Sequence, residues 1–194
     1  MMKSNLENIE KFWANAITFD DYLSIAKKRA ETSDSHDPYQ QYYDLGVQRM
    51  ERTLKKFEVK DEDLEVLESK NFEGKVLIIS EPWCGDASAT VPAVTKFFEA
   101  AGTEVRIFLR DYDQELINQF LTNGTQSIPI ILLLNNDFTV KSVWGPRPKY
   151  GTTLLKKFKE DPEAYPRETF YNDLQIYYAK NRGAEAIEEI LNSI

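Results

Sequence analysis

The chain has 194 residues, 42% of them hydrophobic, so it can bury one full core with an extension, or two small cores, without disulfides. Its formal net charge of −8 argues against nucleic acid as the main partner, because phosphate binding requires clustered lysine and arginine. No stretch approaches the length of an apolar membrane span and the N-terminus lacks a signal-peptide core, so we expect no membrane association and a cytoplasmic location.

Cysteine and histidine each occur once, as Cys84 and His36. A single cysteine excludes an internal disulfide and agrees with a reducing compartment. One Cys and one His far apart in sequence cannot assemble an ordinary four-ligand zinc site, so we expect no structural metal. His36 lies in a polar loop without a catalytic motif around it, which favours a solvated residue.

Helical spacing of apolar residues dominates residues 1–70. A first pattern covers residues 6–25, with Asp20 predicted to cap a second helix. Asp37 before Pro38 predicts the start of a helix through residue 57, and residues 59–69 have the composition of a short solvated helix. We expect this N-terminal extension to pack on the core formed by the rest of the chain.

Residues 71–160 have the alternating pattern of an α/β domain. The apolar run at 76–79 predicts a strand buried on both faces, followed by a helix that begins just after Cys84. Further strands are predicted at 103–109, 130–134 and 138–144, and further helices at 113–123 and 151–159. The βαβα order at the start favours parallel strands, whereas the short turn at 135–137 favours an antiparallel pair.

Residues 161–194 form a predicted helical tail, with helices at 166–180 and 184–191 separated by Gly183. Both helices are amphipathic, so their apolar faces need a surface to cover. We expect them to cover the N-terminal helices or the sheet domain, and a homodimer contact is the alternative.

Cys84 stands where the buried strand gives way to a helix. The free N–H groups and the positive end of the helix dipole favour an anion at such a turn, and the thiolate is the nucleophilic form of cysteine. Because the carboxyl ends of parallel strands share one edge, we expect Arg110 and Asp111, after the next strand, on the same rim. The alternative is that Cys84 is an inert, packed small residue.

The motifs around this cysteine resemble those of the thioredoxin family. They comprise Trp83-Cys84-Gly85 at the turn, Pro92 eight residues after the cysteine, Ser127-Ile128-Pro129 before the predicted hairpin and Gly145 after it. The resemblance covers residues 74–159, and the Trp-Cys-Gly-Asp-Ala turn is similar to a bacterial thioredoxin-like branch. It implies a thioredoxin-like α/β fold, in which a central mixed sheet is flanked by helices, with helical extensions at both termini.

The resemblance also implies roles for individual residues. Cys84 corresponds to the exposed nucleophilic cysteine of the family, and Pro129 to a cis-proline that faces it. The other residues of the implied substrate site are Trp83, Gly85, Asp86, Ile128 and Gly145. Ile128 would offer backbone hydrogen bonds to an extended substrate, and Gly145 would flank the substrate groove.

Two departures from the two-cysteine pattern decide the predicted chemistry. Ala87 stands where a thioredoxin has its resolving cysteine, and Ile78 stands where it has a buried aspartate. A thiolate of Cys84 could still attack a disulfide, but only an external thiol such as glutathione could release the mixed disulfide. No resident cofactor is implied.

Three charged residues are candidates for tuning the cysteine. Asp86 opposes thiolate formation, whereas Arg110 or Arg147 would favour it, or would bind a carboxylate such as those of glutathione. The alternatives are an ordinary helix-start residue for Asp86 and solvated side chains for the two arginines.

The sequence thus predicts single-cysteine thiol–disulfide chemistry, with a thiol or disulfide of a protein or a small molecule as the partner. The alternative is a binding module that holds a peptide or partner protein between Trp83, Pro129 and Gly145, with Cys84 dispensable. A third hypothesis, by analogy with single-cysteine glutaredoxins, is an iron–sulfur carrier that uses Cys84 and glutathione across a dimer.

Overall fold

A mixed four-stranded sheet forms the centre of the fold. The computed structural model describes residues 8–32 and 36–194. The strands are β1 Lys75–Ser80, β2 Val105–Leu109, β3 Ile130–Leu134 and β4 Val140–Trp144, in the spatial order β2-β1-β3-β4. β1 pairs in parallel with β2 and antiparallel with β3, and β3 pairs antiparallel with β4. This arrangement confirms the predicted α/β fold class.

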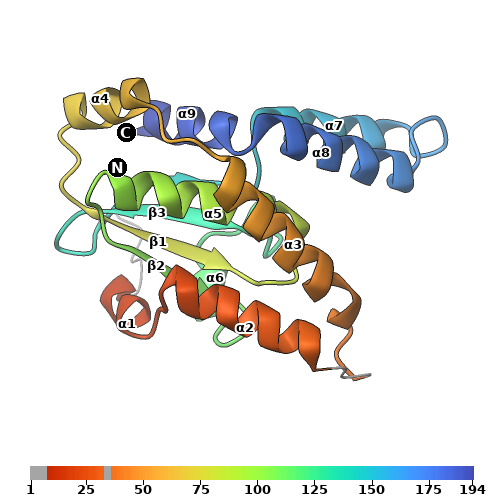
Figure 1. The fold of residues 1–194 in the computed structure, drawn as a ribbon, viewed down its shortest axis with the longest axis horizontal. Helices are drawn as coiled ribbons and strands as arrows, with labels where there is room; N and C mark the ends of the chain where they lie inside the picture. Colours follow the sequence, from red (N-terminus) through yellow and green to blue (C-terminus); the bar gives the residue numbers. More distant parts are fainter. Residues whose placement is uncertain (1–7, 33–35) are drawn as a thin grey trace.

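Helices surround the sheet (Figure 1). They are α1 Ile9–Ala14, α2 Phe19–Glu31, α3 Gln40–Lys56, α4 Asp61–Ser69, α5 Gly85–Ala100, α6 Glu115–Asn118, α7 Lys149–Glu160, α8 Arg167–Asn181 and α9 Ala184–Ser193. α1 and α2 lie on the β2 side of the sheet, whereas α4, α7, α8 and α9 lie together on the opposite side of the molecule. α3 crosses between the two groups and packs on α2 and α5.

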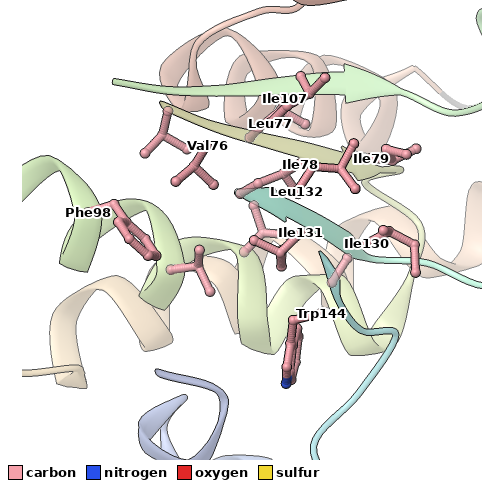
Figure 2. Packing of buried hydrophobic residues seen from close by; sticks show 14 of the residues in the cluster. Val76, Leu77, Ile78, Ile79, Phe98, Ile107, Ile130, Ile131, Leu132 and Trp144 are labelled. Atoms are coloured by element: carbon pink, nitrogen blue, oxygen red, sulfur yellow. The ribbon is translucent and has the colours of Figure 1, made fainter. Parts of the chain in front are cut away.

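The strand that leads to the cysteine is buried along almost its whole length. Val76, Leu77, Ile78 and Ile79 have no exposed surface. Ile78 pairs with Ile107 on one side and with Ile131 on the other, and Figure 2 shows these side chains within one apolar cluster. Burial of each such side chain stabilises the fold by about 1.5–3 kcal/mol. β1 is therefore a rigid support for the turn that follows it.

Two predicted elements between the strands are shorter than expected. The helix predicted at residues 113–123 is wrong in length, because only α6 is helical there. The chain then turns at Asn123 and Gly124, whose φ angles are 51° and 75°, and Thr122 and Thr125 exchange backbone hydrogen bonds around them. β4 likewise begins at Val140 rather than at residue 138, because the hairpin turn extends through Phe138, which has a φ of 64°.

The starts of two N-terminal helices also differ from the prediction. Thr18 rather than Asp20 caps α2, because its hydroxyl accepts the N–H of Asp21 while the Asp21 carboxylate accepts the N–H of Thr18. α3 begins at Gln40, and Asp37 lies in the preceding turn, where it accepts the N–H of Tyr39 at 2.8 Å. The first predicted apolar position, Leu6, lies outside the described residues.

The C-terminal helices pack within the chain. Ile187, Ile190 and Leu191 of α9 are buried in the same cluster as the sheet, and α9 contacts α4, α5 and β4. α8 packs on α7, with Phe170 and Leu174 buried between them. In the described part of the chain, no helix combines the length and apolar character needed to cross a bilayer.

The edge strand β2 pairs with the N-terminal segment at one point. Ile17, between α1 and α2, exchanges two backbone hydrogen bonds with Ile107 of β2, each 2.8 Å long. The pairing is antiparallel and confined to this one bridge. It fixes the start of α2 against the strand whose far end carries Arg110.

Candidate functional site

Cys84 lies at the start of α5, directly after the turn that follows β1. Only 9% of its surface is exposed, and its Sγ donates a hydrogen bond to the carbonyl oxygen of Ile128 at 3.4 Å. The Ile128–Pro129 peptide bond is cis, and a Cβ built on Gly145 would lie 2.3 Å from the carbonyl oxygen of Pro129. Ile128 therefore contacts the buried sulfur directly, and Pro129 and Gly145 lie against each other next to Ile128.

The surroundings of this sulfur favour the thiol over the thiolate. Burial, first, and the nearby Asp86 carboxylate, second, raise the pKa of Cys84 from its ordinary value of 9.0 to about 12. The backbone N–H groups of Ala87 and Asp86 and the Arg147 side chain act in the opposite direction, but less strongly. The thiol is therefore the form that this site favours at neutral pH.

A thiol that stays protonated in the fold makes stability fall at alkaline pH. Between pH 9.0 and about 12 the unfolded state has lost the Cys84 proton and the folded state retains it, so rising pH favours unfolding. We expect the free energy of unfolding of the wild type to fall, relative to Cys84→Ser, by up to about 1.4 kcal/mol per pH unit in this window. Urea unfolding of both proteins between about pH 8 and pH 10.5 checks this, and parallel pH profiles would contradict it.

Asp86, the second residue of α5, is the centre of a buried ion pair. Its Oδ2 accepts a hydrogen bond from Nη2 of Arg147, and its Oδ1 accepts one from the hydroxyl of Tyr178, both at 2.6 Å. The side chains of Asp86 and Arg147 are 9% and 17% exposed. Burial alone would lower the pKa of Arg147, but the Asp86 carboxylate raises it above its ordinary value. Arg147 is therefore a partner of Asp86 and not a solvated side chain.

Trp83 is held between an aromatic ring and an arginine. Its ring stacks on Tyr39 with the centroids 4.1 Å apart, and Cζ of Arg110 lies 4.9 Å from the Trp83 ring centroid. Its Nε1 donates to Asp111 at 3.2 Å, and Arg110 forms an ion pair with the same carboxylate at 2.6 Å. Arg110 thus contacts the tryptophan, whereas Arg147 is the arginine whose charge acts on the cysteine.

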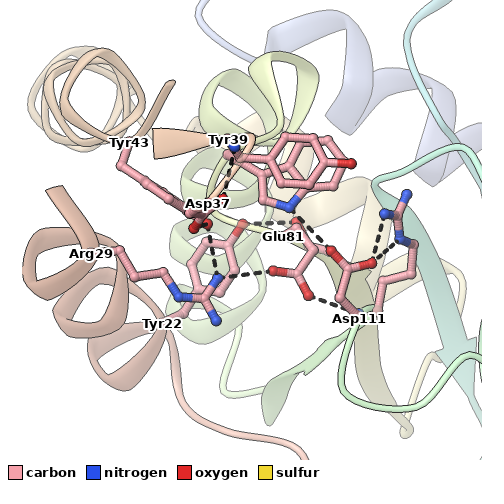
Figure 3. Close-up of polar contacts among 10 residues, drawn as sticks. Tyr22, Arg29, Asp37, Tyr39, Tyr43, Glu81 and Asp111 are labelled. Atoms are coloured by element: carbon pink, nitrogen blue, oxygen red, sulfur yellow. Dashed lines mark hydrogen bonds and ion pairs between the residues drawn. The ribbon is translucent and has the colours of Figure 1, made fainter. Parts of the chain in front are cut away.

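Glu81, which sequence reasoning missed, is a buried carboxylate in the same turn (Figure 3). It is 1% exposed, and its two oxygens accept the N–H of Asp111 at 2.8 Å and Nη1 of Arg29 at 3.3 Å. Arg29 also donates to the hydroxyl of Tyr43, which donates to Asp37 at 3.0 Å. Burial raises the pKa of Glu81, while the bound N–H limits the rise. An acidic residue directly after an apolar strand is the signal that could have identified it.

Residues of both terminal segments reach the cysteine turn. A Cβ built on Gly85 would lie 3.6 Å from Nε2 of Gln175 in α8 and 3.7 Å from Nη1 of Arg49 in α3. Tyr178, one turn further along α8, reaches Asp86. No local sequence pattern indicates these contacts, because the partners are far apart in the sequence.

The described residues contain no group of three or more His, Cys, Asp or Glu side chains placed to hold a metal ion. His36 is exposed, in the turn that precedes α3. The charged and titratable side chains that act on one another at the cysteine turn are Cys84, Asp86, Arg147 and Tyr178.

A comparison of the sequence with known families identifies the family to which the cysteine turn and the sheet belong. A model of the family described as Thioredoxin matches residues 33–159, more than half of the chain. The chain belongs to the thioredoxin family. Comparison with curated proteins returns no match.

Solved structures resemble most of the thioredoxin-family chain. Two of them are a protein of unknown function from Pseudomonas aeruginosa, PA1234, and an HIV epitope scaffold. Each has a TM-score of 0.61 and 16% sequence identity, over 96% of this chain and 96% of its own. At this identity the similarity concerns the fold alone.

Against the thioredoxin-family pattern, the site differs in what surrounds the sulfur. Ala87 and Ile78, at the positions of the resolving cysteine and the buried aspartate, are both fully buried in the apolar core. Cys84, which the family resemblance implies to be exposed, is also buried. Side chains of α3 and α8 lie close to the turn that carries it: Arg49 and Gln175 lie beside Gly85, and Tyr178 reaches Asp86.

Proposed function

We propose that this chain is a thioredoxin-fold binding protein in which Cys84 is a structural thiol. The observation that supports the proposal is the hydrogen bond from Cys84 Sγ to the carbonyl oxygen of Ile128. Ile128 is the residue to which the family resemblance assigns the backbone contacts with substrate, and it is 4% exposed. The cysteine is thus a hydrogen-bond donor within the protein, and it occupies a backbone carbonyl that an incoming substrate would need.

The burial and the raised pKa of the sulfur agree with this proposal. Disulfide exchange requires a thiolate that can approach another sulfur, and both access and ionisation are unfavourable at Cys84. Ala87 leaves no internal thiol to release a mixed disulfide. A free, unreactive cysteine suits a reducing compartment, and we include a cytoplasmic location in the proposal.

Single-cysteine redox chemistry is the second candidate, and one observation favours it. The backbone N–H groups of Asp86 and Ala87 and the charge of Arg147 would all stabilise a thiolate at Cys84 if its burial were relieved. The thiolate would attack one sulfur of a protein or glutathione disulfide, forming a new S–S bond and expelling the other sulfur as a thiolate. A second external thiol would then release the product and restore Cys84.

Exposure of the folded protein to oxidised glutathione near pH 7 separates the two candidates. Because the chain has a single cysteine, any gain of one glutathione in the intact mass reports Cys84. We expect no mixed disulfide in the native protein and full modification in concentrated guanidinium chloride, where the thiol is accessible. Cys84→Ser is the blank for both conditions. Formation of the mixed disulfide by the native protein at the rate of a free thiol would establish the redox candidate instead.

A further inference from the structure

Two helix faces adjoin at the start of α5, one from each terminal segment (Figure 1). On α3 the spacing of three and four residues places Tyr42 and Leu45 on the same face as Arg49 and Arg52. On α8 the spacing of four residues places Arg167, Tyr171 and Gln175 on one face. We name this area the α3–α8 surface, and it consists of Tyr42, Leu45, Arg49, Arg52, Arg167, Tyr171 and Gln175.

The two faces approach each other at two points. At one end Arg49 and Gln175 both lie against Gly85, next to the cysteine. Further out, the pKa of Arg167 is raised first by the hydrogen bond it donates to Tyr171 and more weakly by Tyr42 of α3. The geometric point at which the two faces meet is therefore Gly85.

Large side chains of this surface are exposed. Tyr42 is 48%, Leu45 is 44% and Tyr171 is 47% exposed, and Arg167 covers the ring of Tyr171 with its Cζ 5.4 Å from the centroid. Grouped exposed apolar side chains mark interaction sites, and tyrosine and arginine are enriched among the residues that dominate binding energy. Composition alone thus favours a docking role for this surface.

The charge of the surface is opposite to that of the chain. Within the described residues, no carboxylate forms an ion pair with Arg49, Arg52 or Arg167, although the chain carries a net charge of −8. The acidic residues of α3 lie on its other side, where Glu51 pairs with Lys27 of α2. Burial, first, and the neighbouring Arg52, second, lower the pKa of Arg49. An approaching anion would relieve this repulsion.

A buried acceptor at the inner end of the surface also lacks a partner. Oε1 of Gln175 is buried and receives no hydrogen bond from the described residues. A buried polar atom without a partner is uncommon in native proteins and requires an explanation, such as a water or another polar group that meets it. A peptide N–H is the complementary donor.

We propose that the α3–α8 surface binds an acidic segment of a partner protein, whose carboxylates pair with the three arginines and whose apolar side chains pack on Tyr42, Leu45 and Tyr171. This assignment rests on the proposed binding function and gives that function a location and a partner chemistry. A nucleic acid is disfavoured because three arginines on a strongly acidic chain neutralise few phosphates. The bound segment would end beside Gly85, without requiring chemistry at Cys84.

Selection from a random twelve-residue peptide library on the immobilised full chain tests the proposal, because the library contains acidic and non-acidic sequences alike. We expect the recovered peptides to carry net negative charge with at least one aromatic or aliphatic residue, and their affinity to fall as salt rises. The double variant Arg49→Glu/Arg167→Glu should weaken the best peptide at least tenfold, because arginines central to an interface commonly contribute that much. Lys141→Glu, an exposed charge reversal on β4, is the matched control and should bind like the wild type.

The outcomes that contradict the assignment can be told apart. Recovery of no peptide, or of peptides without acidic enrichment, removes the acidic partner. Tighter binding of a twelve-nucleotide single strand at the same salt indicates a nucleic acid instead, and self-association in sedimentation that the arginine variant abolishes indicates a second copy of the chain. If Cys84→Ser loses the peptide while the arginine variant keeps it, the cysteine turn is the binding site. If glutathione modifies Cys84 while peptide binding follows the arginines, the assignment of the surface stands and only the structural role proposed for Cys84 fails.

Discussion

Replacing Asp86 with asparagine is expected to lower the free energy of unfolding by about 3 kcal/mol. The substitution keeps the size of the side chain but removes the charge that, among the described residues, pairs with Arg147, whose guanidinium is buried together with it. Nε and Nη1 of Arg147 are buried without hydrogen-bond partners among the described residues, so the cation has little compensation besides Asp86. An uncompensated buried charge is far more costly than the lost bond itself.

A second measurement on Asp86→Asn follows from its position beside the sulfur. The carboxylate is the second largest cause of the raised pKa of Cys84, so its neutralisation should lower that pKa and leave burial as the main remaining cause. The pH dependence of the thiolate absorbance in the ultraviolet measures it. The change in the pKa of Cys84 and the loss of stability should therefore appear in the same variant.

Two comparison variants make the stability result interpretable. Glu160→Gln breaks the exposed pair between Lys156 and Glu160 and should change the free energy of unfolding by less than about 0.5 kcal/mol. Asp86→Asn/Arg147→Met removes both buried charges and should recover most of the loss, because an apolar side chain has no charge to desolvate. Urea unfolding of the four proteins is the measurement. A loss below about 1 kcal/mol for Asp86→Asn would show that the pair contributes no more than a surface contact.

Substitution of Gly145 by alanine is the other change for which we expect a large effect, a loss of at least about 4 kcal/mol. Gly145 has a φ of 133°, which side chains with a Cβ rarely adopt, and the added Cβ would lie 2.3 Å from the carbonyl oxygen of Pro129. The atom nearest to the added Cβ is a backbone oxygen, so no side-chain rotation relieves this contact. Circular dichroism and urea unfolding would measure the loss.

Gly102 provides the matched control for this substitution. It also has a positive φ, 76°, but a Cβ built on it would meet nothing within 4 Å. Gly102→Ala should therefore cost only the conformational penalty of about 1–2 kcal/mol. Equal losses in the two variants would mean that φ alone, and not the contact with Pro129, makes glycine necessary at position 145.

The sequence predicts the centre of this fold well because the information is local. The apolar run of β1 and the glycine just after Cys84 determine a buried strand, a turn and a helix within a few residues. The hairpin between β3 and β4 is equally local, although Phe138 belongs to its turn and not to the strand. Where the prediction failed, at the end of α6, the Asn123-Gly124 pair was itself a turn signal.

The state of the candidate site could not be predicted in the same way. The pKa of Cys84 is raised first by burial and second by Asp86, and the contacts that α3 and α8 make at the cysteine turn come from positions far along the chain. Asp86 has an ordinary role as a helix-start residue, and only the structure adds Arg147 and Tyr178 as its partners. Tertiary contacts therefore convert a position suited to a reactive thiolate into one that holds a thiol.

The single bridge between Ile17 and Ile107 has a consequence for how the chain associates with other molecules. A free edge strand presents unpaired N–H and C=O groups to which a strand of another molecule can add, and such additions lead to aggregation. Ile17 occupies both groups of Ile107 in the middle of β2, so a foreign strand would have to displace it. A fragment confined to residues 71–160 would lack Ile17, and the backbone groups of Ile107 would then be free to pair with another strand. The N-terminal segment thus serves the solubility of the sheet as well as the surroundings of the cysteine.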